Sequence, residues 1–141
     1  MVSSGAQEMH DVVVRIKQPE LCYIFAKNAT ERGQPELALQ AYRHAVDLRA
    51  AEHEVQTEAE LMAIKAFYAY EEALSWQNGK RKRATGTWQM VNRIGILPTL
   101  QKRLTSKSAE AAQSALKQLN LDDYSFQAVA KAYAADLMRA A

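Results

Sequence analysis

From Glu20 towards the end of the chain, apolar residues recur every three or four positions, which is the period of amphipathic α-helices. No stretch alternates apolar and polar residues as a half-buried β-strand does. A first helix begins near Glu20 and ends where Gly33 and Pro35 interrupt the pattern, and Pro35 suits the first turn of a second helix. The apolar positions are Leu21, Ile24, Phe25 and Ala29 in the first helix and Leu37, Ala38, Ala41, Tyr42, Ala45, Val46 and Leu48 in the second. The pattern therefore predicts an all-α fold that starts with a helical hairpin.

The third predicted helix is the longest and the most apolar. Thr57, followed by Glu58 and Glu60, fits a capping box with an acidic first turn, and Asn78 with Gly79 fits a left-handed C-cap. Between these ends, alanines and large apolar residues occupy nearly every side of the helix. Because a helix that is apolar all round is buried, we expect residues 57–77 at the centre of the bundle.

Shorter helices are predicted after Gly79. The pattern predicts helices over 84–93, 98–107, 108–119 and 122–137, with Gly95 closing the first of these and Ser108 and Asp122 as later N-caps. Residues 1–18 are less regular, and we expect a poorly ordered segment or one short element there. The chain of 141 residues has the length of one ordinary domain. We therefore predict a single-domain bundle of six or seven helices over residues 19–141.

The predicted hairpin has the residue spacing of a known repeat. Residues 20–50 resemble one tetratricopeptide helix pair, in which small residues let two helices approach and a tyrosine fills the gap beside them, at Ala26, Gly33, Ala38, Tyr42, Ala45 and Leu48. The chain departs from the repeat at Ala29, where an aromatic residue is usual, and no second copy follows roughly 34 residues later. Because stable arrays need about three repeats, the resemblance implies a single hairpin of this shape inside another fold.

Charge divides the chain into a basic segment and an acidic remainder. Residues 80–107 contain no Asp or Glu and eight cations, which are Lys80, Arg81, Lys82, Arg83, Arg93, Lys102, Arg103 and Lys107. Eight of the 18 Lys and Arg lie here, so ten remain outside the segment together with all 16 acids. The net charge of +2 is thus a +8 segment within a −6 remainder. Because concentrated positive charge attracts polyanions and releases their counterions, the segment predicts nucleic-acid binding, with DNA before RNA.

Two modes of binding are open for this segment. The predicted helices 84–93 and 98–107 are short, basic and joined by a turn with Gly95, which is the outline of a helix-turn-helix. Any two bundle helices with a tight turn share that outline, and phosphate attachment by the same surface is the simpler alternative. Trp88 and Gln89 are the candidate base contacts, because tryptophan can stack on a base. A tryptophan on a helix more often belongs to the core, and we expect this role for Trp88.

Short motifs between Phe67 and Leu137 resemble a group of uncharacterised bacterial all-helical proteins. The motifs are YEEAL, NGKR, RAT, TWQM and the GI pair after Arg93. That group carries an arginine before the TW pair where this chain has Gly86, so the role of that arginine does not transfer. The resemblance implies no activity. It does imply one shared site, formed by Tyr70, Glu71, Asn78, Gly79, Lys80, Arg83, Trp88 and Gln89.

The sequence lacks the common catalytic and metal-binding patterns. Glu71 and Glu72 are neighbours on a helix and point about 100° apart, so they do not form an acid/base pair by themselves. The three histidines lack metal-ligand spacing, and no nucleophile elbow or Gly-rich phosphate loop occurs. The single cysteine, Cys22, has no disulfide partner in the chain, and we expect it to be buried. We therefore expect no catalytic residue, no cofactor and no metal.

The preferred function is non-catalytic nucleic-acid binding through residues 80–107. One alternative is a protein-interaction module, in which the hairpin docks a partner or the cations receive an acidic protein surface. A minor alternative is a metal-dependent nuclease that uses Glu71 or Glu72 with Lys80. No stretch has the roughly 18 apolar residues of a membrane span and no signal peptide is evident, so we expect a cytoplasmic protein without membrane contact. The oligomeric state stays open, because acidic and basic regions can also pair between copies.

Overall fold

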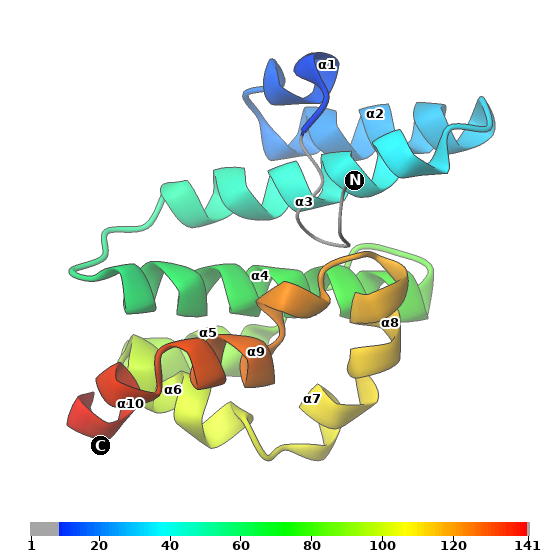
Figure 1. Ribbon diagram of the computed structural model, residues 1–141. Coiled ribbons are helices and arrows are strands. Elements are labelled where there is room, and N and C mark those ends of the chain that lie inside the picture. The colour runs from blue at the N-terminus through cyan, green and yellow to red at the C-terminus, as the bar shows by residue number, and fades with distance from the viewer. Residues whose placement is uncertain (1–8, 141) are drawn as a thin grey trace.

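The computed structural model describes residues 9–140, which form helices and the connections between them (Figure 1). No strand occurs in this range, which confirms the predicted all-α bundle. The first half of the chain contains α1 (Asp11–Val14), α2 (Pro19–Glu31), α3 (Pro35–Ala51) and α4 (Glu58–Asn78). The second half contains α5 (Thr85–Ile94), α6 (Ile96–Arg103), α7 (Lys107–Ala111), α8 (Gln113–Gln118), the 3₁₀ turn η1 (Asp122–Tyr124), α9 (Phe126–Ala132) and α10 (Ala134–Ala140). None of the helices within residues 9–140 is long and apolar enough to cross a membrane.

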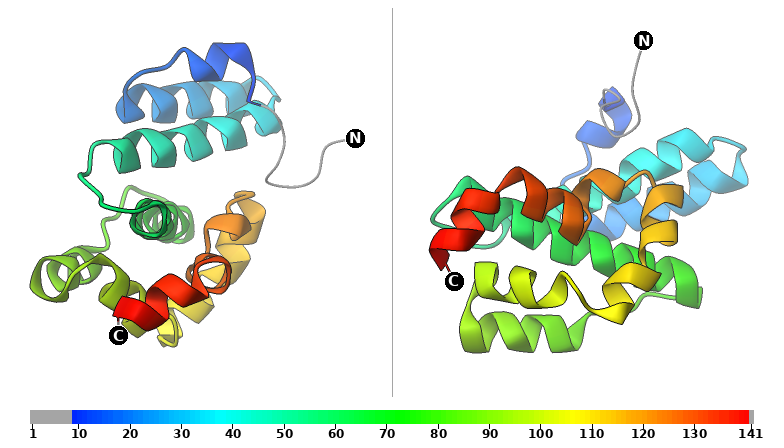
Figure 2. Two further views of the ribbon diagram at one scale, coloured as in Figure 1. Left: turned by 60° about the vertical axis from the view of Figure 1, so that its left-hand side comes forward. Right: turned by 60° about the horizontal axis from the view of Figure 1, so that its bottom comes forward.

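Helix α4 lies between two layers of helices. The hairpin of α2 and α3, with α1 beyond it, covers one side, and the elements from α5 to α10 cover the other (Figures 1 and 2). Twelve of the 21 residues of α4 are buried, and they point to all sides of the helix. The predicted central position of this helix is confirmed.

The two ends of α4 follow the sequence signals. Thr57 Oγ1 accepts a hydrogen bond from the backbone N–H of Glu60 at 3.1 Å. The returning Glu60 carboxylate accepts from the N–H of Gln56 at 2.7 Å, one residue before the position that a capping box predicts. Gly79 ends the helix in the left-handed conformation, with φ 72°. The chain therefore turns sharply back at the start of the basic segment.

Several predicted helix ends in the second half are wrong. Helix α6 begins at Ile96 and not at Pro98, because Pro98 fits within the first turn, where a backbone N–H is not needed. The N-caps are Ser106 and Ser125 in place of Ser108 and Asp122, since their hydroxyls accept from Ala109 N and Ala128 N. The predicted helices over 108–119 and 122–137 are each divided into shorter elements.

The α2–α3 hairpin is held by small buried residues, which are Ala26, Ala29, Ala38, Ala41 and Ala45. Cys22 is buried in the same cluster, as expected, and α1 packs on it through Val13. Gly33 has φ 74° and open space where a Cβ would stand. Its role is therefore the left-handed turn between the helices and not the close helix contact that the repeat pattern predicted. The described part of the predicted N-terminal segment is α1 and its flanks, and residues 1–8 lie outside the described range.

Helices α5 and α6 fold back on one another at a single residue, Gly95. A helix-turn-helix has a turn of about three or four residues. Helix α6 also packs against α4, α9 and α10, and its Thr99 and Leu100 are fully buried. Its first turn is apolar and packed, whereas a recognition helix places its first residues on base edges. Helices α5 and α6 therefore lack the turn and the exposed first turn that a groove-reading helix-turn-helix has.

Candidate functional site

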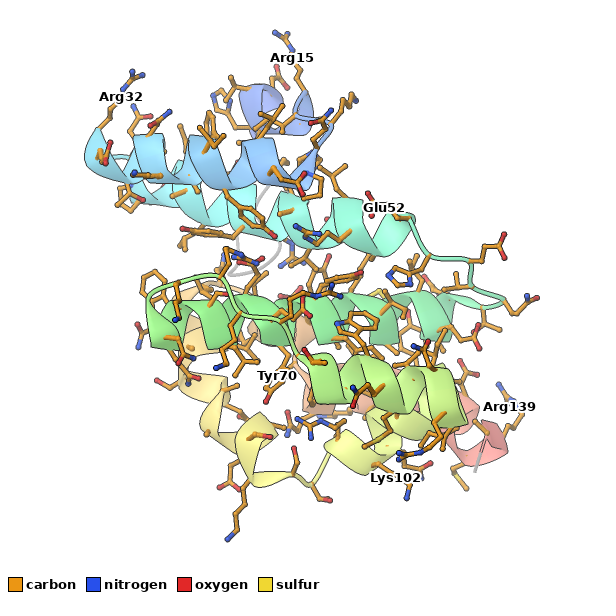
Figure 3. All side chains as sticks on the ribbon, turned by 180° about the vertical axis from the view of Figure 1, so that it is seen from behind. Arg15, Arg32, Glu52, Tyr70, Lys102 and Arg139 are labelled. Atoms are coloured by element: carbon orange, nitrogen blue, oxygen red, sulfur yellow. The ribbon has the colours of Figure 1, made fainter. Side chains whose placement is uncertain are left out.

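The first part of the basic segment, residues 80–84, runs back along α4 after the turn at Gly79 (Figure 3). The N–H of Lys82 donates to Ser75 Oγ at 2.9 Å, and the N–H of Ala84 donates to Glu71 Oε2 at 2.9 Å. Ser75 and Glu71 are both buried on α4. The loop is therefore fixed by polar side chains of the central helix.

Arg81 is directed inward to a buried carboxylate. Its Nη1 and Nη2 donate to the two oxygens of Glu72, each at 2.8 Å, and the Glu72 side chain is only 3% exposed. Tyr23 of α2 also donates its hydroxyl to Glu72 at 3.0 Å and itself accepts from Arg49 Nε at 3.0 Å. Burial, and next the charge of Glu72, raise the pKa of Tyr23 well above its usual range. This network joins the basic loop to the α2–α3 hairpin.

Glu71 anchors a second group on the same helix. Its Oε2 accepts from Trp88 Nε1 at 2.6 Å as well as from Ala84 N. Arg83 Nε lies 3.8 Å from the same oxygen, beyond hydrogen-bond distance, and the Arg83 side chain is 74% exposed. The two adjacent carboxylates are thus held separately by different partners. Their geometry gives no support to the nuclease alternative, which needs one of them open.

The ring of Trp88 is partly buried and packs against aromatic neighbours. His53 stacks on it, with 5.3 Å between ring centroids, and Tyr68 and Phe67 contact it at 4.7 and 5.6 Å. His53 is in turn hydrogen-bonded to the Tyr68 hydroxyl at 2.6 Å. Trp88 therefore takes the packing role that we expected, while the other candidate base contact, Gln89, is exposed on α5.

The other cations of the basic segment differ in their surroundings. Arg103 Nη2 donates to Tyr70 OH at 3.3 Å and to Ser108 Oγ at 3.0 Å, so this guanidinium is held against the bundle. The remaining cations are exposed and make no ion pair with any residue of 9–140; they are Lys80, Lys82, Arg93, Lys102 and Lys107. We call these five residues the free cations. The other three members of the predicted set, Arg81, Arg83 and Arg103, have internal contacts.

The shared site implied by the bacterial resemblance is only partly assembled. Glu71, Arg83 and Trp88 lie together, as described above. Tyr70 packs on the other side of α4, against Phe126 and Arg103. The remaining implied residues do not join the Glu71 group: Asn78 Nδ2 donates to the Leu74 carbonyl, Gly79 and Lys80 border a cleft, and Gln89 is exposed.

That cleft lies between the hairpin and the end of α4 and has a volume of about 570 Å³. It is lined by Tyr23, Lys27, Tyr42, Glu72, Ser75, Trp76, Gly79, Lys80, Arg81 and Leu119. Arg81 crosses the Tyr23 ring at 4.0 Å from its centroid. Burial lowers the pKa of Arg81, but its bonds to Glu72 and the charge of that carboxylate outweigh this and keep the pKa above its ordinary value. The guanidinium therefore stays charged in the wall of the cleft.

The described residues contain no group of three or more His, Cys, Asp or Glu that could hold a metal ion. The histidines have local partners: His10 caps α1 by accepting from Val12 N, and His44 contacts the carbonyl of Ile16 at 2.8 Å. Neither a protein-family model, nor a curated protein, nor a solved structure matches this chain.

Sequence reasoning missed the residues that the hairpin contributes to this region. The sequence pattern gives Tyr42 a packing role in the hairpin and singles out neither Tyr23 nor Lys27, yet all three line the cleft. Tyr23 and Glu72 are 49 positions apart, and no local pattern links them. A usable signal was the Glu71–Glu72 pair on a helix that is apolar all round, because buried carboxylates require partners.

Proposed function

We propose that the protein binds nucleic acid, DNA before RNA, through the free cations of residues 80–107. The observation that carries this proposal is that Lys80, Lys82, Arg93, Lys102 and Lys107 are exposed and have no carboxylate partner within residues 9–140. Exposed cations without internal partners are available to replace the counterions of a phosphate backbone.

The proposed binding mode is attachment to phosphates. Trp88 is partly buried and packs against His53, Tyr68 and Phe67, and the first turn of α6 packs into the bundle, so we assign base reading to neither. Figure 3 shows Lys102 on one side of the molecule and Arg15 and Arg32 on the opposite side, with the hairpin. Phosphate contacts hold a protein on the duplex without direct sequence information, so we propose binding that depends little on base sequence.

The experiment is a titration by fluorescence anisotropy with two duplexes of unrelated sequence, a single strand and an RNA at several salt concentrations. Five phosphate contacts on duplex DNA predict a slope of log affinity against log salt of up to about 4.5 in magnitude, since each contributes about 0.9. We expect the two duplexes to give similar affinities. Absence of saturable binding at low salt, or a slope near zero, would contradict the proposal.

A second candidate is a protein-interaction role of the hairpin. Leu21 and Ile24 are 48% and 57% exposed on α2 and are one helical turn apart. A second copy of the chain is the first partner to test, by sedimentation equilibrium of the native protein and of a variant with Leu21→Ser and Ile24→Ser. Self-association that the double variant loses would support this role, and a native protein that stays monomeric at high concentration would count against it.

A further inference from the structure

The cleft beside Glu72 has the dimensions of a small-molecule site. Its volume of about 570 Å³ lies within the range of about 300–1,000 Å³ that is usual for ligand pockets. Its walls come from α2, α3, the end of α4 and the first residues of the basic loop. The Glu72–Arg81–Tyr23 network fixes these parts relative to one another. The cleft is therefore already formed without a ligand.

The charges around the cleft favour an anion. Lys27, Lys80 and Arg81 line it, against the single carboxylate of Glu72. Both oxygens of Glu72 already accept from Arg81, so this carboxylate is not open to a cationic ligand. Lys27 and Lys80 make no ion pair with any residue in the described range. Two ammonium groups thus remain to bind an acidic group.

The uncharged part of the wall favours a planar ring. Trp76 is 50% exposed at the cleft, and its Nε1 donates to Gln118 Oε1 at 3.3 Å, which holds the indole in place. Leu119 supplies further apolar surface. Tyr42 also lines the cleft, and its hydroxyl makes no hydrogen bond within residues 9–140, so it is free to donate to a ligand there. An exposed indole of this kind can stack on a planar ring.

We propose that this cleft binds a small aromatic anion, that is, a planar ring that carries a phosphate or a carboxylate. The ring lies on the face of Trp76, and the anionic group is held by the ammonium groups of Lys27 and Lys80, with the Tyr42 hydroxyl as an additional donor. This site shares Lys80 with the free cations of the proposed nucleic-acid attachment, whereas its other proposed contacts, Lys27, Tyr42 and Trp76, lie outside residues 80–107.

The test is calorimetric titration with two probes, adenosine monophosphate for the phosphate and naphthylacetate for the carboxylate. Adenosine and inorganic phosphate test the ring and the anion alone. We expect at least one probe to bind with a dissociation constant below about 1 mM. If adenosine monophosphate binds, the dissociation constants of adenosine and of inorganic phosphate should each be at least about tenfold higher than its own.

Matched variants show whether binding occurs in the cleft. Lys27→Ser with Lys80→Ser should weaken binding about tenfold or more, because it removes both charge-assisted contacts. Trp76→Ala should weaken it about fivefold or more through lost stacking. The control, Lys102→Ser with Lys107→Ser, changes the net charge equally and should leave binding unchanged. Binding of neither probe below about 1 mM, or equal losses in the two double variants, would overturn the proposal.

Discussion

Arg81 and Arg83 are two positions apart in the same basic loop, yet their substitution should affect stability very differently. Arg81 supplies two of the hydrogen bonds to Glu72, whose side chain is 3% exposed. Removing one partner of a buried ion pair costs about 3–5 kcal/mol. The Arg81 side chain is 46% exposed, so water reaches the pair, and we expect Arg81→Met to lower the free energy of unfolding by about 2–3 kcal/mol. Methionine retains an apolar stem beside Tyr23 and so isolates the loss of charge.

Arg83→Met is the matched control. Arg83 is 74% exposed, and its only ion pair within residues 9–140 is at 3.8 Å, so its removal should cost less than about 1 kcal/mol. Urea unfolding followed by far-ultraviolet circular dichroism measures both variants. Adding Glu72→Gln to Arg81→Met should recover part of the loss, because the unpaired buried charge is then absent. Equal costs for the two arginine variants, or no recovery in the double variant, would refute the assigned roles.

Three further predictions concern the packing of the hairpin, the packing of Trp88 and the reactivity of the buried Cys22 thiol. Ala38→Leu should lower the free energy of unfolding by about 1–3 kcal/mol through overpacking between α2 and α3, whereas Ala51→Leu, at an exposed position of α3, should not. Equal melting temperatures of the Ala38 variant and the native protein would show that the contact is absent. Trp88→Ala should cost about 3 kcal/mol of folding free energy, and Trp76→Ala, at a half-exposed ring, should cost less; the reverse order in chemical unfolding would contradict the packing role of Trp88. Burial, and next the charge of Glu72, raise the pKa of Cys22 to about 11. Only roughly one thiol in a thousand is then ionised at pH 8, so a thiol reagent should label the native protein slowly and the urea-unfolded protein fast, and equal rates would contradict this.

The main features of the fold could be predicted because its strongest signals are local. Thr57 and Gly79 bound α4 as expected, since each has a property that its neighbours lack: a capping hydroxyl before an acidic turn, and tolerance of positive φ. The cap of α7 could not be chosen in the same way, because Ser106 and Ser108 are both suitable and lie two residues apart. Which of the two caps the helix depends on how α6 ends against the bundle.

The candidate site was predictable only in part. The charge division identified the basic segment, but it treated all eight cations alike. The direction of Arg81 depends on Glu72 and Tyr23, and Tyr23 reaches this position only because the hairpin packs across α4. Long-range contacts of this kind leave no local periodicity. The cleft has the same origin, since its walls are brought together by the packing of α2 on α3 and of α3 on α4.

The most direct test of the proposed function compares two triple variants with the same change in net charge. One carries Ser in place of Arg93, Lys102 and Lys107, and the other carries Ser in place of Arg15, Lys17 and Arg32, which are exposed at or near the hairpin. Salt-dependent binding to duplex DNA is measured for both variants and for the native protein. We predict that the first variant lowers the magnitude of the salt slope by up to about 2.7, at about 0.9 per contact, and that the second leaves it unchanged. Equal slopes in the two variants would contradict nucleic-acid binding through the free cations.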